Sequence, residues 1–205
     1  MSNPEFQAAR AEKSREKILN AALGLFVERG FEEVALKDIA KAAKVSTATL
    51  FSHYPQKEAL LAGAIDVLAK MRDETTARNT LPVSDALRSI GLSYARRLDN
   101  PMLLGLIRMG ILLKDKAEGL GQAVNDAWRK PFINRLNDVL DQGVEQRYWL
   151  ITDRNVAARQ FFGMITDAIL WPRLFGMSDA APAGYREAVV DEAIKTFMTR
   201  YTVKD

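Results

Sequence analysis

Residues 36–57, LKDIAKAAKVSTATLFSHYPQK, decide how this chain folds. Ile39, Ala40 and Ala43 recur at helical spacing and form the inner face of a first short helix. After a turn, a second short helix is expected over residues 47–54. The small alanines let the two helix backbones approach closely at a steep crossing angle. The pattern predicts a helix-turn-helix, the motif whose second helix enters the major groove of DNA, although any helical hairpin can share it.

The second helix of this motif begins with a favourable cap and presents a polar outer face. Ser46 precedes it, and serine is among the residues preferred at a helix amino terminus. Its outward positions are Thr47, Thr49, Ser52 and His53. Short polar side chains of this kind suit base edges and phosphates better than a protein core.

The sequence around the motif makes it more specific. Ser14-Arg15-Glu16-Lys17-Ile18-Leu19 precedes it, Gly30-Phe31 ends the first helix, and Lys57-Glu58-Ala59-Leu60 follows it. Together with Asp38-Ile39-Ala40 and Leu50-Phe51-Ser52-His53-Tyr54, these residues resemble the DNA-binding domain of the TetR family of transcriptional regulators. The resemblance covers roughly the first 65 residues, in order and without gaps.

The resemblance implies an all-α fold of about nine helices in two domains. Residues 1–60 are expected to form a three-helix helix-turn-helix DNA-binding domain, with residues 1–12 as a loose arm. Residues 61–205 are expected to form a helical bundle for ligand binding and dimerisation, similar only loosely to AefR-like repressors. Periodicity and caps outside the motif predict helices over 14–29, 57–73, 83–99, 102–114, 120–147, 155–175 and 183–201. A kink is expected at Pro131, and the polar tract 72–80 is the expected domain boundary.

Candidate DNA-binding residues follow from the motif and from the resemblance. By resemblance, His53 and Lys57 contact backbone phosphates, while Thr47, Ala48 and Thr49 face the bases. The complete predicted set is Lys37, Lys44, Ser46, Thr47, Ala48, Thr49, Phe51, Ser52, His53 and Lys57.

Four positions depart from the family pattern. Ala35 replaces a capping Thr or Ser, Lys44 replaces a Gly in the turn, and Phe51 and Tyr54 exchange the usual Tyr and Phe. Ala35 cannot cap the first helix of the motif with a side-chain oxygen, and Phe51 has no hydroxyl for a phosphate. Tyr54 is interpreted as a core residue. Because of these departures, a helical scaffold or adaptor that has lost DNA binding stays as an alternative.

Composition excludes several other classes of function. The 205 residues are 48% hydrophobic and 27% charged, as in globular proteins, and the net charge is only +3. Because the chain has no cysteine and its one histidine is His53, we expect no disulfide, metal site or cofactor, and an all-α enzyme lacks a catalytic group. No run of about 18 apolar residues occurs, so we expect a cytoplasmic protein that does not contact membrane.

Apolar residues of the C-terminal part are candidates for a ligand pocket and for a dimer interface. The predicted pocket residues are Tyr94, Leu103, Ile107, Arg108, Trp128, Phe132 and Asp167, although the apolar ones suit a plain core equally well. Arg108 and Asp167 are either buried polar anchors or solvent-facing charges. The last two helices are apolar around most of their circumference, which favours a second copy as partner. The predicted interface residues are Phe161, Ile165, Ala168, Pro172, Val189, Ala193 and Phe197.

The resemblance as a whole implies a ligand-responsive transcriptional regulator, a repressor rather than an enzyme. It would bind a palindromic DNA operator as a homodimer. A small and largely apolar molecule in the C-terminal pocket would release it from the operator.

Overall fold

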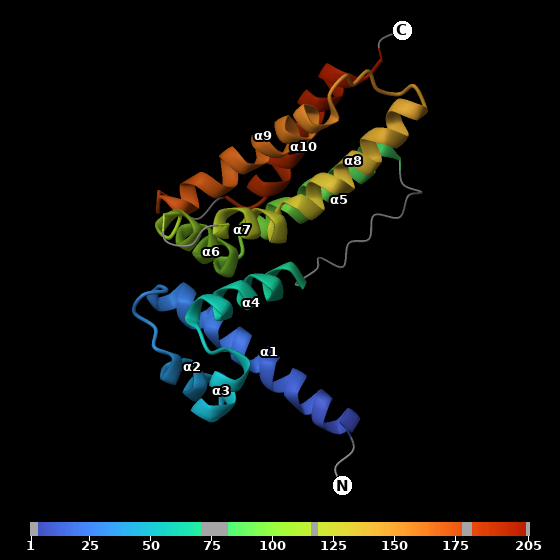
Figure 1. The fold of residues 1–205 in the computed structure, drawn as a ribbon. Helices are drawn as coiled ribbons and strands as arrows, with labels where there is room; N and C mark the ends of the chain where they lie inside the picture. The colour runs from blue at the N-terminus through green and yellow to red at the C-terminus, as the bar shows by residue number, and fades with distance from the viewer. Residues whose placement is uncertain (1–3, 71–81, 116–118, 178–181, 204–205) are drawn as a thin grey trace. The chain divides into compact units, whose positions relative to one another are not determined.

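The computed structural model describes residues 4–70, 82–115, 119–177 and 182–203 (Figure 1). These residues form ten α-helices, one more than expected, and their only β-pairing is an isolated bridge between Trp149 and Thr202. The all-α prediction is confirmed. The chain divides into two compact units, Met1–Arg72 with Gly105–Ala127, and Asp73–Leu104 with Trp128–Asp205.

The first unit contains the predicted helix-turn-helix. Helix α1 (Pro4–Arg29) packs against α2 (Leu36–Ala43) and α4 (Lys57–Lys70), and α2 packs against α3 (Thr47–His53). The core lies where these four helices meet, and its fully buried side chains include Ile18, Leu23, Phe26, Ile39, Leu50 and Leu60. The helix-turn-helix is therefore held by an apolar core that α1 and α4 share with it.

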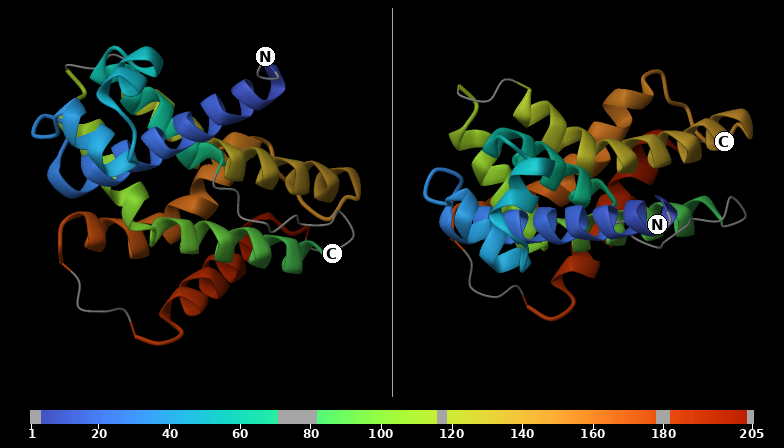
Figure 2. Two further views of the ribbon diagram at one scale, coloured as in Figure 1. Left: turned by 90° about the horizontal axis from the view of Figure 1, so that it is seen from below. Right: turned by 60° about the horizontal axis from the view of Figure 1, so that its bottom comes forward.

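The predicted loose arm is wrong for residues 4–12, because α1 is one continuous helix that begins at Pro4 (Figure 2). Proline is tolerated at the start of a helix, where its missing N–H group would have no partner. The residues that follow, from Gln7 to Lys13, are mostly strong helix formers. Helix propensity therefore extends α1 even though this stretch has no apolar face. The end of α1 is as predicted: Gly30 has φ of 89°, and Phe31 packs on Phe26 with ring centroids 5.2 Å apart.

The first unit also includes residues 105–127, from α6 (Pro101–Leu112) and α7 (Leu120–Trp128). A Cβ added at Gly105 would lie 2.5 Å from the Val27 side chain, so α6 approaches α1 more closely than any larger residue allows. Asn100 caps the start of α6, because its side chain accepts a hydrogen bond from the Met102 N–H at 2.8 Å.

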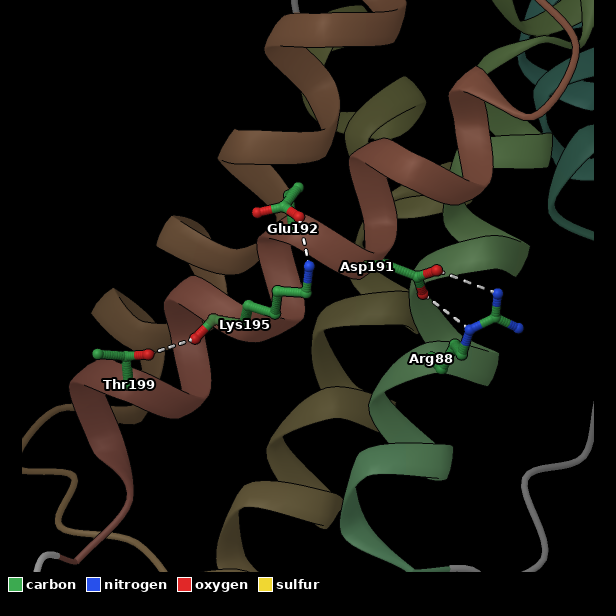
Figure 3. A network of polar contacts seen from close by, with 5 residues as sticks. All are labelled: Arg88, Asp191, Glu192, Lys195 and Thr199. Carbon is green, nitrogen blue, oxygen red and sulfur yellow. Dashed lines mark hydrogen bonds and ion pairs between the residues drawn. The ribbon is translucent and has the colours of Figure 1, made fainter.

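The second unit is a bundle of four long helices (Figure 1). Helix α5 (Val83–Leu98) packs against α8 (Lys130–Glu145), α9 (Arg154–Leu174) and α10 (Tyr185–Tyr201). Ion pairs reinforce this packing. Arg88 of α5 contacts Asp191 of α10 at 2.8 Å (Figure 3), and Asp99, at the end of α5, pairs with Arg173 and Arg186.

The predicted helix over 120–147 is two helices rather than one kinked helix. Helix α7 ends at Trp128, and α8 begins at Lys130, with Pro131 in its first turn. Because a proline in the first turn loses no hydrogen bond, restarting the helix there is cheaper than bending one around the ring. The expected domain boundary at 72–80 lies outside the described residues. Within the described ranges, no helix combines the length and the apolar character that a membrane crossing requires.

Candidate nucleic-acid interface

Ser46 fixes the start of α3 as predicted. Its hydroxyl oxygen accepts a hydrogen bond from the Thr49 N–H at 3.0 Å, and the two hydroxyl oxygens are 2.8 Å apart. Leu50, on the opposite side of the helix, is fully buried. One face of α3 is thus anchored in the core of the first unit, and the other is left to solvent.

The predicted DNA-binding side chains all retain access to solvent. Those of Lys37, Lys44, Ser46, Thr47, Ala48, Phe51 and Ser52 are exposed, and those of Thr49, His53 and Lys57 are half-buried. None belongs to the core, and all lie on α2, on the turn, on α3 or at the start of α4. Their role on DNA stays a prediction, but their positions are compatible with it.

Two departures from the family pattern have local consequences in the structure. Ala35 caps α2 only with its backbone, and no side-chain hydrogen bond is made there. Lys44 ends α2 in the left-handed region, with φ of 55° and ψ of 43°. A side chain at such a position costs roughly 1 kcal/mol, because its Cβ crowds the following carbonyl.

Tyr54 is a core residue, as interpreted from the sequence. It is buried, and its hydroxyl accepts a hydrogen bond from the Arg15 Nε at 2.9 Å. Arg15 was not among the predicted site residues. The signal for a polar partner was Tyr54 itself, because the family usually has Phe at this position. The bond ties α1 to the end of α3.

The amino group of Lys57 is held by two contacts within the first unit. It donates a hydrogen bond to the Glu32 carbonyl oxygen at 3.0 Å and lies 4.6 Å from the centroid of the Phe31 ring. These contacts place the charge at the start of α4, where the family resemblance expects a phosphate. His53, on the last turn of α3, has its ring centroid 6.5 Å from that of Tyr54.

In the second unit, three of the predicted pocket residues meet in an aromatic cluster. The ring of Tyr94 stacks on Trp128 at 5.7 Å and meets the edge of Phe132 at 5.3 Å. Phe162, which was not predicted, lies 4.4 Å from Tyr94. Leu103 is also buried. The sequence therefore predicted the apolar character of these residues, and the structure shows rings that pack on one another.

The polar groups of this cluster differ from those predicted. The hydroxyls of Tyr94 and Thr166 are 2.8 Å apart, and burial raises the pKa of Tyr94 above its usual value of 10.0 despite that bond and the nearby positive charge of Arg129. The Arg129 Nε is buried and makes no hydrogen bond within the described part of the chain. Sequence patterns do not identify Arg129 as part of this cluster, because its position depends on the break between α7 and α8.

The two predicted polar anchors face solvent instead. The side chains of Arg108 and Asp167 are both exposed, which is the second of the two alternatives that the sequence left open. Ile107 and Arg108 belong to the first unit, whereas the aromatic cluster belongs to the second.

Four of the predicted interface residues are buried in the core of one chain and do not reach its surface. Phe161, Ile165, Ala193 and Phe197 are at most 3% exposed, because they form the contact between α9, α10 and the rest of the second unit. Ala168, Pro172 and Val189 are half-buried. The large apolar side chains that α9 exposes are Val156 and Trp171, at 47% and 44%. Sequence periodicity identified apolar helices but did not separate their inner faces from their outer faces.

Comparisons with known proteins agree with this architecture of a helix-turn-helix followed by a helical bundle, which defines a class of DNA-binding regulator. Residues 18–64 match the family of bacterial regulatory proteins called tetR, and residues 85–203 match the C-terminal domain of AefR-like transcriptional repressors. The chain belongs to the TetR family of transcriptional regulators, a class without enzymatic activity.

Curated relatives match mainly in the DNA-binding part. The chain is 42% identical over 55 residues to the HTH-type transcriptional regulator UidR of Escherichia coli K12, covering 27% of this chain and 28% of UidR. It is 30% identical over 107 residues to an uncharacterised HTH-type regulator, Rv1255c, of Mycobacterium tuberculosis, covering 47% and 50%. The chain thus spans half or less of the length of these relatives.

Solved structures match over nearly the whole chain. A structure described as the flavonoid-responsive regulator FrrA is 25% identical, with a TM-score of 0.78 over 95% of this chain and all of that one. A TetR regulator from Agrobacterium tumefaciens is 24% identical, with a TM-score of 0.74 over 93% and 95%, and it supports the fold alone.

Proposed function

We propose that this protein is a ligand-responsive repressor that binds a palindromic operator as a homodimer. The observation that carries the proposal is the helix-turn-helix itself, in which Ser46 caps α3 and Leu50 anchors it while its polar face stays exposed. Residues 1–60 supply DNA binding, and residues 61–205 supply ligand binding and dimerisation.

Two groups of side chains divide the work on DNA. Lys57 and His53 contact backbone phosphates, which positions α3 but carries no sequence information. Thr47, Ala48 and Thr49 face the base edges, where methyl groups suit thymine and hydroxyls pair with several bases.

The division is tested by fluorescence anisotropy on DNA from upstream of the protein's own gene and on a random duplex. Lys57→Ala should weaken binding to both and lower the slope of log affinity against log salt by about one. Thr47→Ala should change the preference between the two duplexes more than the overall affinity. Lys114→Ala, at an exposed lysine outside the helix-turn-helix and outside α9 and α10, is the matched control and should change neither.

If Lys57→Ala lowers affinity for the upstream DNA alone, the phosphate assignment is wrong. A wild-type protein that binds the upstream DNA no better than the random duplex would favour the scaffold alternative.

The proposed dimer uses α9 and α10. A two-fold interface requires one patch to meet its own copy, and α9 exposes a large apolar side chain near each end, Val156 and Trp171. The half-buried Ala168, Pro172 and Val189 belong to this interface. The buried Phe161, Ile165, Ala193 and Phe197 support it from within the chain.

The proposed effector is a small aromatic molecule that binds at the cluster around Tyr94. The cluster gathers aromatic rings, the paired hydroxyls of Tyr94 and Thr166 and the charge of Arg129, and a phenolic molecule that parts the rings would stack on them and bond to the hydroxyls. FrrA, which shares the fold over 95% of this chain, is described as flavonoid-responsive. A phenolic effector is consistent with both observations.

A further inference from the structure

Three cations of α1 share one face of the helix. Arg10, Lys13 and Lys17 recur at i, i+3 and i+7, which places them on one side. Glu12 and Glu16 lie on another side and, together with Arg15, line a hollow between α1 and α4.

The basic face of α1 lies opposite the turn of the helix-turn-helix. Arg10, Lys13, Ser14 and Lys17 from α1, and Lys44, Val45, Ser46 and Thr49 from the turn and α3, line one open hollow of ≈ 510 Å³. Its lining contains four cations and no carboxylate. Within the described part of the chain, none of the four cations forms an ion pair with an acid.

This arrangement is complementary to an anion. Like charges that share a hollow repel one another, and a bound anion converts that repulsion into attraction. Lys44, Ser46 and Thr49 also belong to the predicted DNA face, so the hollow continues the surface that meets the duplex. Phosphates of a duplex that lies along α3 can therefore reach it.

We infer that the hollow between α1 and the turn, called here the α1 cradle, binds backbone phosphates beyond those contacted by the recognition helix and Lys57. The inference rests on the proposed function, because it assigns additional contacts to the same DNA. Arg10, Lys13 and Lys17 are then DNA-binding residues that the motif does not include. They extend the phosphate footprint without reading sequence.

The test compares two triple variants with equal loss of charge. Arg10→Gln/Lys13→Gln/Lys17→Gln removes the α1 contribution to the cradle. Lys114→Gln/Lys130→Gln/Arg147→Gln removes three exposed cations that do not line it and that lie outside α9 and α10. Binding to upstream and random DNA is measured by anisotropy over a series of salt concentrations, and circular dichroism gives each Tm.

The cradle variant should lose roughly 100-fold in affinity at 0.1 M salt on both duplexes, and its salt slope should fall by about 2 to 3, at about 0.9 per lost phosphate contact. The control should keep a slope within about 0.5 of the wild type. Ethylation of the duplex phosphates that contact the cradle should block DNA binding by the wild type and should not weaken DNA binding by the cradle variant further. The Tm of the cradle variant should not fall, because the substitutions remove repulsion between the cations of the cradle.

A cradle variant whose slope equals that of the control would overturn the inference while leaving the proposed function intact. Wild-type protein without any salt-dependent DNA binding would overturn both. Calorimetric titration with pyrophosphate alone tests whether the hollow binds a free anion rather than the phosphates of DNA. Binding of pyrophosphate to the wild type but not to the cradle variant, without a change in DNA affinity, would assign the hollow to a free anion and contradict the inference.

Discussion

At the scale of single residues, the helix-turn-helix depends on a few positions whose chemistry is local. The capping role of Ser46, the missing cap at Ala35 and the core position of Tyr54 were all predicted from the sequence and are seen in the structure. Caps depend on neighbours three residues away, so one sequence is enough to predict them. The bond between Arg15 and Tyr54 joins residues 39 positions apart, so the tyrosine signals a polar partner but no local pattern identifies Arg15 as that partner.

Lys44 gives a prediction at this scale, because it combines local strain with a charge on the DNA side. Lys44→Gly should raise the free energy of unfolding by about 1 kcal/mol, since glycine adopts φ of 55° without crowding. Tm should rise by about 2–4 °C. Lys44→Ala removes the same charge and keeps the Cβ, so any gain from relieved repulsion is common to both variants and Lys44→Ala should be less stable than Lys44→Gly by about 1 kcal/mol. Thermal melts of both variants check this, and equal stabilisation by Ala would show that the strain is absent.

At the scale of helices, the sequence predicted which helices exist better than it predicted where they begin and end or which of their faces are buried. The apolar periodicity of α5, α9 and α10 located these helices, but the start of α1 and the break at Arg129 escaped it. Both depend on backbone propensity and on proline geometry rather than on apolar spacing. The faces of α9 could not be assigned because apolar side chains on it meet the chain's own core on one side and solvent on another.

The aromatic cluster between α5, α8 and α9 yields the prediction for the effector. Tyr94→Phe keeps the ring and removes the hydroxyl that meets Thr166, so affinity for a hydrogen-bonding flavonoid should fall about 10-fold. Quenching of the tryptophan fluorescence, to which Trp128 of the cluster contributes, by a panel of flavonoids measures this affinity. Operator affinity without ligand should stay unchanged.

Tyr148→Phe, at an exposed tyrosine outside the cluster, is the control. If the two variants bind every flavonoid equally well, the cluster is core and the effector site lies elsewhere. A loss of operator affinity in ligand-free Tyr94→Phe would lead to the same conclusion.

At the scale of the whole molecule, the proposed repressor is a two-state device. Two recognition helices must lie roughly 34 Å apart to enter successive major grooves. An effector that lowers the operator-competent fraction of the protein from 99% to 1% must bind the incompetent state about 5.5 kcal/mol more tightly than the competent state. By reciprocity, operator DNA must weaken effector binding by the same factor. The size of this preference cannot be deduced from sequence, because it is a free-energy difference between two states of the dimer.

Trp171→Glu tests the assembly without disturbing the core. Trp171 is 44% exposed on α9, so a carboxylate there is tolerated by the single chain but costs several kcal/mol in a dry interface. The variant should be a folded monomer with weak operator binding. Leu150→Glu, at a side chain that is 73% exposed and belongs to neither α9 nor α10, should remain a dimer.

The most direct test of the account is the number of chains bound to one operator duplex, measured by sedimentation velocity on the upstream DNA. We predict two chains per duplex for the wild type and for Leu150→Glu, with no stable complex for Trp171→Glu at the same concentration. One wild-type chain per duplex, or equal binding of Trp171→Glu, would contradict the claim that this protein reads its operator as a symmetric dimer.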